Sequence, residues 1–258
     1  MKTLKEIFDY RQMIFSLVRK DLRGRYKGSF LGFMWTFINP LLQLIVYTVV
    51  FSLILKTDTE RYYLYLFVAL IPWIFFSSSL TGGASSVVAQ KDLIKKIYFP
   101  RQVIPISYVT SCFVNMLLSF IVVFAVVIFS GNGINPLALL CLPVIMFAEY
   151  ILALGTALIA SSVTVYFRDL EHILGIISMA LMYMTPIMYD KAIVPENLLP
   201  IFNLNPMTHI IECYRAVLYY RTVPELSGLL SSFVLGSVFL VAGHFLFIRL
   251  QRHFAEEL

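Results

Sequence analysis

The longest uncharged stretch of this chain, from Gln102 to Ala148, limits its possible folds more than any other feature. An α-helix rises about 1.5 Å per residue, so this stretch would be roughly 70 Å long as one helix, whereas the hydrocarbon core of a bilayer is about 30 Å thick. Its middle holds "SGNGINP", Ser130 to Pro136, whose glycine, asparagine and proline residues break helices and favour tight reversals. We therefore predict two membrane-spanning helices joined by a turn.

Similar uncharged runs occupy much of the remaining chain, and only 14% of its 258 residues are charged. Soluble domains devote about a quarter of their residues to charge. The runs predict an all-α integral membrane protein with six transmembrane helices, at about 30–55, 62–83, 103–129, 136–166, 171–189 and 228–248. We expect no secretory signal peptide, because the first apolar run starts after about thirty residues and is too long to be one.

The distribution of lysine and arginine predicts which loops face the cytoplasm. The amino terminus, the 84–102 loop, the 167–171 loop and the carboxy terminus together hold fifteen of the 20 basic residues. The opposite side holds the other five: Lys56, Arg61, Lys191, Arg215 and Arg221. The positive-inside rule therefore places both termini in the cytoplasm. The net charge of +5 reflects this topology and contact with anionic membrane lipids, and it does not indicate a nucleic-acid partner.

The first predicted cytoplasmic segment, residues 1–28, has the pattern of an interface helix. Its "TLKE", Thr3 to Glu6, has the spacing of a capping box, and apolar residues then recur at helical period opposite a basic face. Such a helix lies in the headgroup layer with its apolar face down. The residues leave open whether it is only an anchor or also a docking surface for a cytoplasmic partner.

The second cytoplasmic segment, residues 84–102, is longer than a simple connector needs to be. We expect a basic amphipathic helix from Lys91 to Phe99, with Leu93, Ile94 and Ile97 on one side, that ends at Pro100. It could be a lipid-binding surface helix or a helix that receives force from a cytoplasmic protein, and the residues alone favour neither.

The segment after the fifth predicted span, residues 190–226, alternates prolines with apolar fragments too short to cross a bilayer. Fragments of about 10–14 apolar residues are typical of re-entrant or interfacial helices. Irregular backbone at membrane depth needs surrounding protein or a water-filled cavity to satisfy its polar groups. We therefore expect this segment to cap a cavity on the extracytoplasmic side.

Ionisable residues at mid-depth, which would indicate an enzyme or an ion-coupled carrier, are scarce. Glu149, about halfway along the fourth predicted span, is the one carboxylate there, and a structural role is favoured over transport. His172, His209 and His244 lack the spacing of metal ligands, so no metal site is predicted. The chain has no G-x-x-x-x-G-K-[ST] loop, so we expect ATP hydrolysis, if any, in another polypeptide.

Several motifs in series resemble a known family. They are "KDLIKKIYFPRQVIPIS" (Lys91 to Ser107), "VYFRDLEHI" (Val165 to Ile173), "TPIMY" (Thr185 to Tyr189), "VPE" (Val194 to Glu196) and "LNPMTHIIECYRAVL" (Leu204 to Leu218). Together they resemble the membrane subunit of type-2 ABC exporters, and most of all the branch that exports lipid-linked O-antigen, teichoic acid or capsule chains. The resemblance covers nearly the whole chain, with the motifs in the expected order and spacing.

The resemblance implies a single transmembrane domain over residues 1–258, located in the bacterial cytoplasmic membrane. It implies a homodimer bound to two copies of a cytoplasmic ATPase, with ATP and magnesium in that partner and no cofactor, metal or catalytic residue in this chain. It also implies re-entrant outer helices between the fifth and sixth spans.

Two sets of site residues follow from the resemblance. The cytoplasmic gate and coupling surface comprises Lys91, Asp92, Lys95, Lys96, Tyr98, Phe99, Pro100, Arg101, Arg168, Asp169 and Glu171. The extracytoplasmic outer gate, within residues 190–226, comprises Asn205, Pro206, Glu212, Tyr214 and Arg215.

The resulting hypothesis is a non-catalytic permease that exports a lipid-linked glycan. ATP binding in the partner would close its cytoplasmic domains, the contact helices would carry that movement, and a channel between two copies of this chain would open. One alternative is an exporter of a drug or small lipid with the same architecture. The others are an ion-driven carrier that uses Glu149 and a membrane-embedded glycosyl- or acyltransferase, which would need a cluster of carboxylates or histidines at one membrane face.

Overall fold

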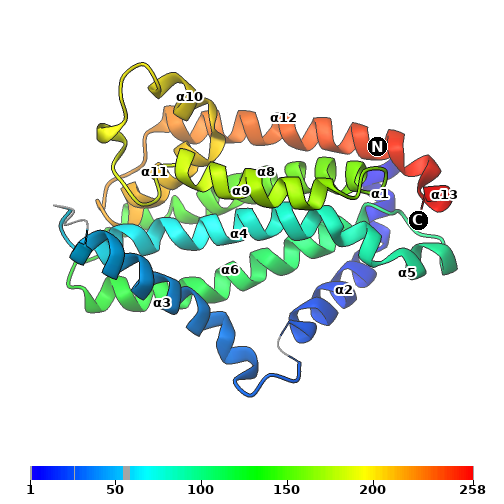
Figure 1. The fold of residues 1–258 in the computed structure, drawn as a ribbon, viewed down its shortest axis with the longest axis horizontal. Helices are drawn as coiled ribbons and strands as arrows, with labels where there is room; N and C mark the ends of the chain where they lie inside the picture. The colour runs from blue at the N-terminus through cyan, green and yellow to red at the C-terminus, as the bar shows by residue number, and fades with distance from the viewer. Residues whose placement is uncertain (1, 26, 55–58, 258) are drawn as a thin grey trace.

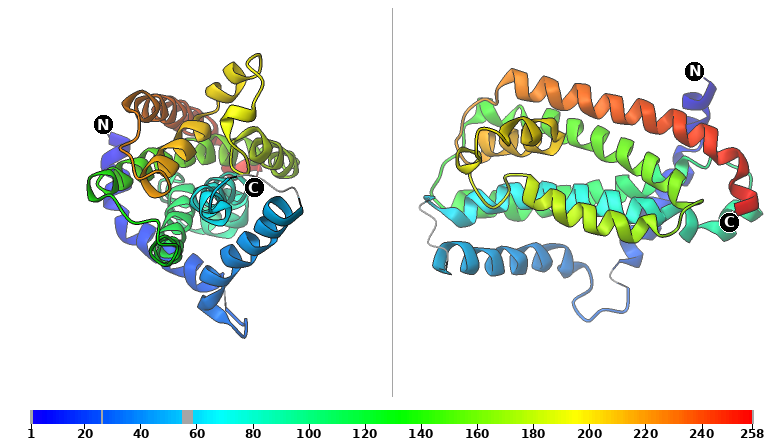
Figure 2. Two further views of the ribbon diagram at one scale, coloured as in Figure 1. Left: turned by 90° about the vertical axis from the view of Figure 1, so that its left-hand side faces the viewer. Right: turned by 45° about the horizontal axis from the view of Figure 1, so that its top comes forward.

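A computed structural model describes residues 2–25, 27–54 and 59–257 of the chain (Figure 1). The predicted end of the first span at residue 55, and Lys56, lie outside these residues. The described residues form helices and no strand. The long helices run side by side, whereas α1 (Lys2–Asp9) and α2 (Arg11–Gly24) cross the bundle at a steep angle (Figures 1 and 2).

Five helical segments in this part of the chain are long and apolar enough to cross a membrane: Gly32–Ser52, Tyr62–Lys96, Val103–Phe129, Pro136–Thr164 and Leu226–His253. They overlap five of the six predicted spans and confirm an all-helical, multi-pass membrane protein, although the second continues beyond its predicted end at residue 83 into the predicted 84–102 loop. The remaining predicted span, 171–189, is a shorter apolar helix, α9 (Leu170–Met184). It ends at Thr185, whose backbone is extended because the following proline disfavours the helical conformation there.

The spans are built from these elements: a 3-10 turn (Gly32–Met34), α3 (Trp35–Thr48) and a π-helical segment (Val49–Ile54); α4 (Tyr62–Ala89); α6 (Val103–Phe129); α7 (Pro136–Leu139) and α8 (Leu142–Thr164); and α12 (Leu226–Leu250). The connecting and terminal elements are α5 (Lys91–Lys96), a 3-10 turn (Lys191–Ile193), α10 (Leu199–Leu204), α11 (Pro206–Leu218), a 3-10 turn (Gln251–His253) and α13 (Phe254–Glu257).

Two details of the predicted cytoplasmic helices are wrong. The single interface helix is two helices, α1 and α2, separated at Tyr10. The helix expected from Lys91 to Phe99 ends at Lys96, because Pro100 has no N–H to continue the helical bonds and disfavours helical backbone before it. Ile97 is therefore extended and 55% exposed, whereas Phe99 turns into the interior and is 4% exposed.

The bundle has two distinct ends (Figures 1 and 2). Both termini, α5 and the turn between α8 and α9 lie at one end, which we call the terminal end. Residues 59–61, the turn 130–135 and the segment 185–225 lie at the other, which we call the loop end. The basic residues outside α2 and the residues that follow it therefore divide between the ends as the sequence predicts, apart from Lys56, which is not described, whereas those of α2 lie on a helix that crosses the bundle.

The helices α8 and α12 approach each other closely, and two glycines permit it. A Cβ atom on Gly155 would lie 2.4 Å from the backbone nitrogen of Leu240, and one on Gly243 would lie 2.6 Å from the carbonyl oxygen of Gly155. Side chains do not tolerate such distances, and small residues commonly allow helix backbones to approach within membranes. This contact fixes α12 along the length of α8.

We expect Gly155→Ala to destabilise the protein, because the added methyl group meets backbone atoms and forces α8 and α12 apart. Overpacking of this kind costs about 1–3 kcal/mol, which should lower the Tm in detergent by roughly 3–10 °C. Gly175→Ala in α9 is the matched control, since no atom lies within 4 Å of its added Cβ and alanine favours the helix. Equal melting temperatures for the two variants would contradict the packing.

Candidate functional site

The predicted coupling residues form a largely exposed, charged surface at the terminal end. Exposed residues of this set are Lys91, Asp92, Lys95, Lys96, Tyr98, Arg168, Asp169 and Glu171. Pro100 and Arg101 are half-buried, and Phe99 is buried. The side chain of Tyr98 is 95% exposed, which leaves a large aromatic ring without cover from this chain. The structure thus brings both predicted coupling segments to one end, where a partner can reach them.

Both coupling segments rest on one small hydrophobic cluster. It contains Phe99 after α5, Val165 before the α8–α9 turn, Phe247 of α12 and Phe254 of α13. The rings of Phe247 and Phe254 are 5.4 Å apart and nearly perpendicular. Because close-packed interiors transmit displacement, movement of one coupling segment requires this cluster to shift with it.

Sequence reasoning missed the contribution of the carboxy-terminal residues to this end. Arg101 donates a hydrogen bond to the carbonyl oxygen of Gln251. The Tyr166 hydroxyl donates one to the carbonyl oxygen of Leu250, at 2.7 Å. Both acceptors are backbone groups, so no residue type in the sequence announces these contacts. They bind the end of α12 to the two coupling segments.

At the loop end, Arg215 is 3% exposed and organises the segment that follows α9. Its Nη1 and Nη2 atoms donate to the carbonyl oxygens of Pro186 and Ile187, at 2.5 and 2.6 Å. Its guanidinium lies 3.6 Å from the ring centre of Tyr65, close enough for a cation–π contact. No carboxylate of the described residues forms an ion pair with Arg215.

The neighbouring Tyr214 connects α11 to the interior of α8. Its hydroxyl donates to Oε2 of Glu149 at 2.7 Å, and both side chains are fully buried. The other carboxyl oxygen, Oε1, has no hydrogen-bond partner among the described residues. Glu149 is thus partnered by a polar group of a neighbouring helix, which agrees with the structural interpretation of this residue.

The other predicted outer-gate residues fix the beginning and the exposed side of α11. The Asn205 side chain accepts from the backbone nitrogen of Met207 at 3.0 Å, and Pro206 occupies the first helical position. Asn205 also donates from Nδ2 to Oγ1 of Thr185, at 2.8 Å. Glu212 pairs with Lys191 at 3.0 Å. These contacts, with those of Arg215, hold residues 185–191 against α11.

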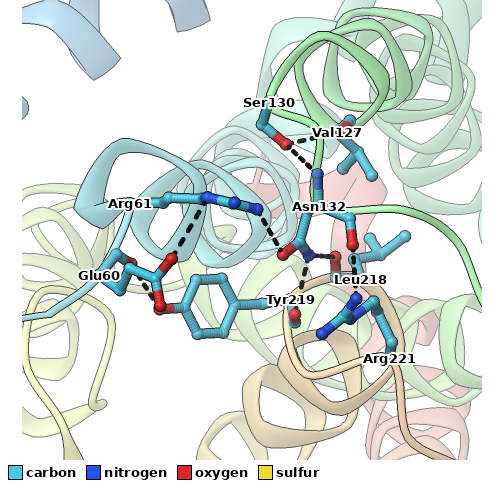
Figure 3. Close-up of polar contacts among 8 residues, drawn as sticks. All are labelled: Glu60, Arg61, Val127, Ser130, Asn132, Leu218, Tyr219 and Arg221. Carbon is cyan, nitrogen blue, oxygen red and sulfur yellow. Dashed lines mark hydrogen bonds and ion pairs between the residues drawn. The ribbon is translucent and has the colours of Figure 1, made fainter.

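Figure 3 shows a further loop-end network that sequence reasoning missed. Asn132 accepts from Nη1 of Arg61 at 3.0 Å and donates to the carbonyl oxygen of Tyr219 at 2.9 Å. Its own carbonyl oxygen accepts from Nη1 of Arg221 at 2.8 Å. Arg61 and Arg221 have φ angles of 50° and 60°, a left-handed conformation uncommon outside glycine. The network therefore holds the start of α4, the 130–135 turn and the end of α11 together.

The chain is similar to a known family of membrane proteins. The family model described as "ABC-2 type transporter" matches residues 12–219. The chain belongs to the ABC-2 type transporter family. The matched residues include both predicted site regions of this ABC-2 protein, at the terminal end and at the loop end.

Three relatives of this ABC-2 transporter chain show how far the similarity extends. The O-antigen export system permease protein RfbA of Myxococcus xanthus is 32% identical over 100% of both chains. A protein of the same name from Klebsiella pneumoniae is 32% identical over 93% of this chain and 92% of its own. The polysialic acid transport protein KpsM of Escherichia coli is 23% identical over 78% of each. These similarities confirm the family predicted from the motifs.

The buried Tyr214–Glu149 bond of this ABC-2 chain can be tested by a double-mutant cycle. We expect Tyr214→Phe to cost about 1–3 kcal/mol of stability, because it removes the donor of a buried carboxyl group. In a chain that already carries Glu149→Leu, Tyr214→Phe should cost much less stability, because the carboxylate that accepts the tyrosine hydrogen bond is absent. Unfolding of the four proteins in detergent should give a coupling free energy above about 1 kcal/mol. Additive effects would contradict a direct interaction.

Proposed function

We propose that this chain is the membrane subunit of an ATP-driven exporter that moves a lipid-linked polysaccharide across the bacterial cytoplasmic membrane. The observation that carries the proposal is the end-to-end similarity to an O-antigen export system permease, at 32% identity over 100% of both chains. The name of the more distant KpsM, a polysialic acid transport protein, points to the same class of cargo. The chain itself acts as a conduit, and ATP and magnesium bind to a separate ATPase.

In this proposal α9 is the fifth of six spans and the terminal end faces the cytoplasm. The 15 residues of α9 rise only roughly 22 Å, so the segment after it must complete the crossing. Ile187 and Met188 continue the apolar interior beyond α9, at 0% and 3% exposure. The largely buried α11 then acts as a re-entrant outer helix, because irregular backbone at membrane depth must be surrounded by protein.

The export path lies between two copies of the chain, on the side of α3. Gln43 donates to Asn39 at 2.9 Å, and Asn39 is exposed in the middle of this apolar helix. Amides facing hydrocarbon are costly, so this face needs water or protein over it. Between Leu226 and Phe245, by contrast, the exposed large side chains of α12 are apolar: Leu226, Leu230, Val234, Val238, Val241 and Phe245. The exposed face of α12 therefore contacts lipid, and the exposed face of α3 lines the export path.

The exposed charged surface at the terminal end is the proposed docking site for the ATPase, with one ATPase on each of the two copies of the chain. Lys95 and Lys96 project from α5 above the cluster that joins α4, α8 and α12. A displacement of α5 by the ATPase is therefore transmitted to α4, α8 and α12 together. This arrangement gives the partner a mechanical connection to the path without requiring any nucleotide-binding residue in this chain.

Reconstitution tests the proposal directly. The chain should co-purify with an ABC ATPase, and the two proteins in liposomes should move a lipid-linked O-antigen across the bilayer only when ATP is present. Liposomes with the chain alone should show no movement of the glycan. Movement without the ATPase, or an intact complex that moves no glycan but exports a small lipid, would contradict the proposed function.

Charge reversal on α5 tests the docking site. We expect Lys95→Glu with Lys96→Glu to lower ATP-dependent export at least about tenfold while the amount of chain in the membrane stays unchanged, because both side chains are exposed and neither forms an ion pair with another described residue. The matched control is Arg249→Glu with Arg252→Glu, which makes the same charge change on exposed residues of the same end. Normal export by the α5 variant would contradict the assignment.

A further inference from the structure

A cleft of about 470 Å³ separates α2 from the terminal-end halves of α4 and α6. The polar side chains on its walls include Lys20, Arg25, Ser85, Gln90, Ser107 and Tyr108. Leu17, Ala89 and Ile104 add apolar surface between them. The cleft therefore offers cationic and hydroxyl groups beside hydrocarbon-like walls, a combination suited to an amphiphile with an anionic head.

The position of the cleft also suits a membrane amphiphile. It extends along α4 from Gln90, where that helix ends, to Gly82, a distance of roughly 12 Å along the helix axis. It thus reaches from the terminal end into the depth of the lipid headgroups and upper acyl chains. A soluble anion would have no use for the apolar part of such a site.

The cleft carries an excess of positive charge. Arg25 binds Oδ2 of Asp21 through Nε and Nη2, at 3.1 and 3.0 Å, so these two charges largely compensate each other. Ser111 also donates to Asp21 and fixes its carboxylate on the α6 side. Lys20 forms no ion pair with any described residue. Its ammonium group is therefore the free cation of the cleft.

Arg25 connects this cleft with the α3 face. Its side chain also lines a smaller cavity, of about 60 Å³, between α3, α4 and α6. The same cavity is lined by Asn39 and Gln43, the amide pair assigned above to the export path. One arginine thus borders both spaces, and polar groups continue from the cleft beside α2 to the amide pair of α3, of which Asn39 is exposed.

We infer that the cleft between α2, α4 and α6 binds the phosphate-linked head of the lipid-linked glycan before the glycan enters the path. This inference rests on the proposed function, because it assigns the anionic amphiphile to the substrate. Lys20 contacts the phosphate, the hydroxyl groups of Ser85 and Tyr108 offer hydrogen bonds, and the apolar wall holds the first part of the lipid chain. Arg25, held in place by Asp21, leads the head toward Asn39.

Binding by the purified full-length chain tests the inference. The probes are a polyprenyl pyrophosphate, phosphatidylglycerol and the zwitterionic phosphatidylcholine, with affinity measured by native mass spectrometry in detergent. The wild-type chain should bind the polyprenyl pyrophosphate more tightly than either phospholipid. Lys20→Gln should weaken that binding about tenfold, because it removes one charge-assisted contact.

Arg19→Gln is the matched control. It removes the same charge from the neighbouring position of α2, but Arg19 lines the opposite side of that helix, away from the cleft. It should change the affinity less than about twofold. A second variant, Ser85→Leu, should also weaken binding by filling the cleft with a larger side chain. Lys20 is exposed, so Lys20→Gln gives a folded protein whether or not Ser85→Leu does.

Two results would overturn the site. The first is that Lys20→Gln and Arg19→Gln bind polyprenyl pyrophosphate with equal affinity. The second is that the wild-type chain binds phosphatidylglycerol and polyprenyl pyrophosphate with equal affinity. The second result would assign the cleft to ordinary anionic phospholipid. Failure here is distinguishable from failure of the proposed function. If the complex exports glycan but Lys20→Gln binds polyprenyl pyrophosphate as tightly as the wild type, only the site is overturned. If the wild type binds polyprenyl pyrophosphate as expected and Lys20→Gln weakens that binding, but the complex exports no glycan, only the function is overturned.

Discussion

The hydrocarbon layer controls this structure, because it permits ionisable side chains only at its surfaces or with a partner inside the protein. The chain satisfies the constraint in both ways. Most lysine and arginine residues lie at the terminal end or in α2, whereas α11 carries Tyr214 and Arg215 into the interior. Glu149 accepts from Tyr214, and Arg215 binds two backbone carbonyl groups and the face of Tyr65. These contacts make α11 part of the bundle.

The same long helices connect the two ends. In α4, Val87 belongs to the terminal-end cluster, while the Tyr62 and Tyr65 hydroxyls donate to the carbonyl oxygens of Met188 and Tyr189 at 2.8 and 3.0 Å. In α8, Leu158 belongs to that cluster and Glu149 binds Tyr214. A displacement at the coupling surface therefore has two continuous helices through which to reach the segment proposed as the outer gate. Rigid helices suit this task better than loops would.

Hydropathy and charge predicted what depends on the bilayer: the membrane class, five spans and the division of basic residues between the ends. Features that depend on contacts between residues far apart in the chain were not predicted. The sequence could not show that Phe99 leaves α5 to join Phe254, or that Asn132 binds Arg61 and Tyr219, since such partners are far apart in the chain. The effect of proline was predicted only in part. The helix before Pro100 was expected to continue to Phe99, but it ends at Lys96, and Ile97 is already extended.

ATP-driven export by this chain requires the terminal end to face the cytoplasm, where an ATPase can push on it. Single cysteines at Lys95 and Glu196, both exposed, test this in a background without Cys112, Cys141 and Cys213. A membrane-impermeant maleimide should label Glu196→Cys in intact cells and Lys95→Cys only after the membrane is opened. Labelling of Lys95→Cys in intact cells would place the coupling surface outside and contradict the account.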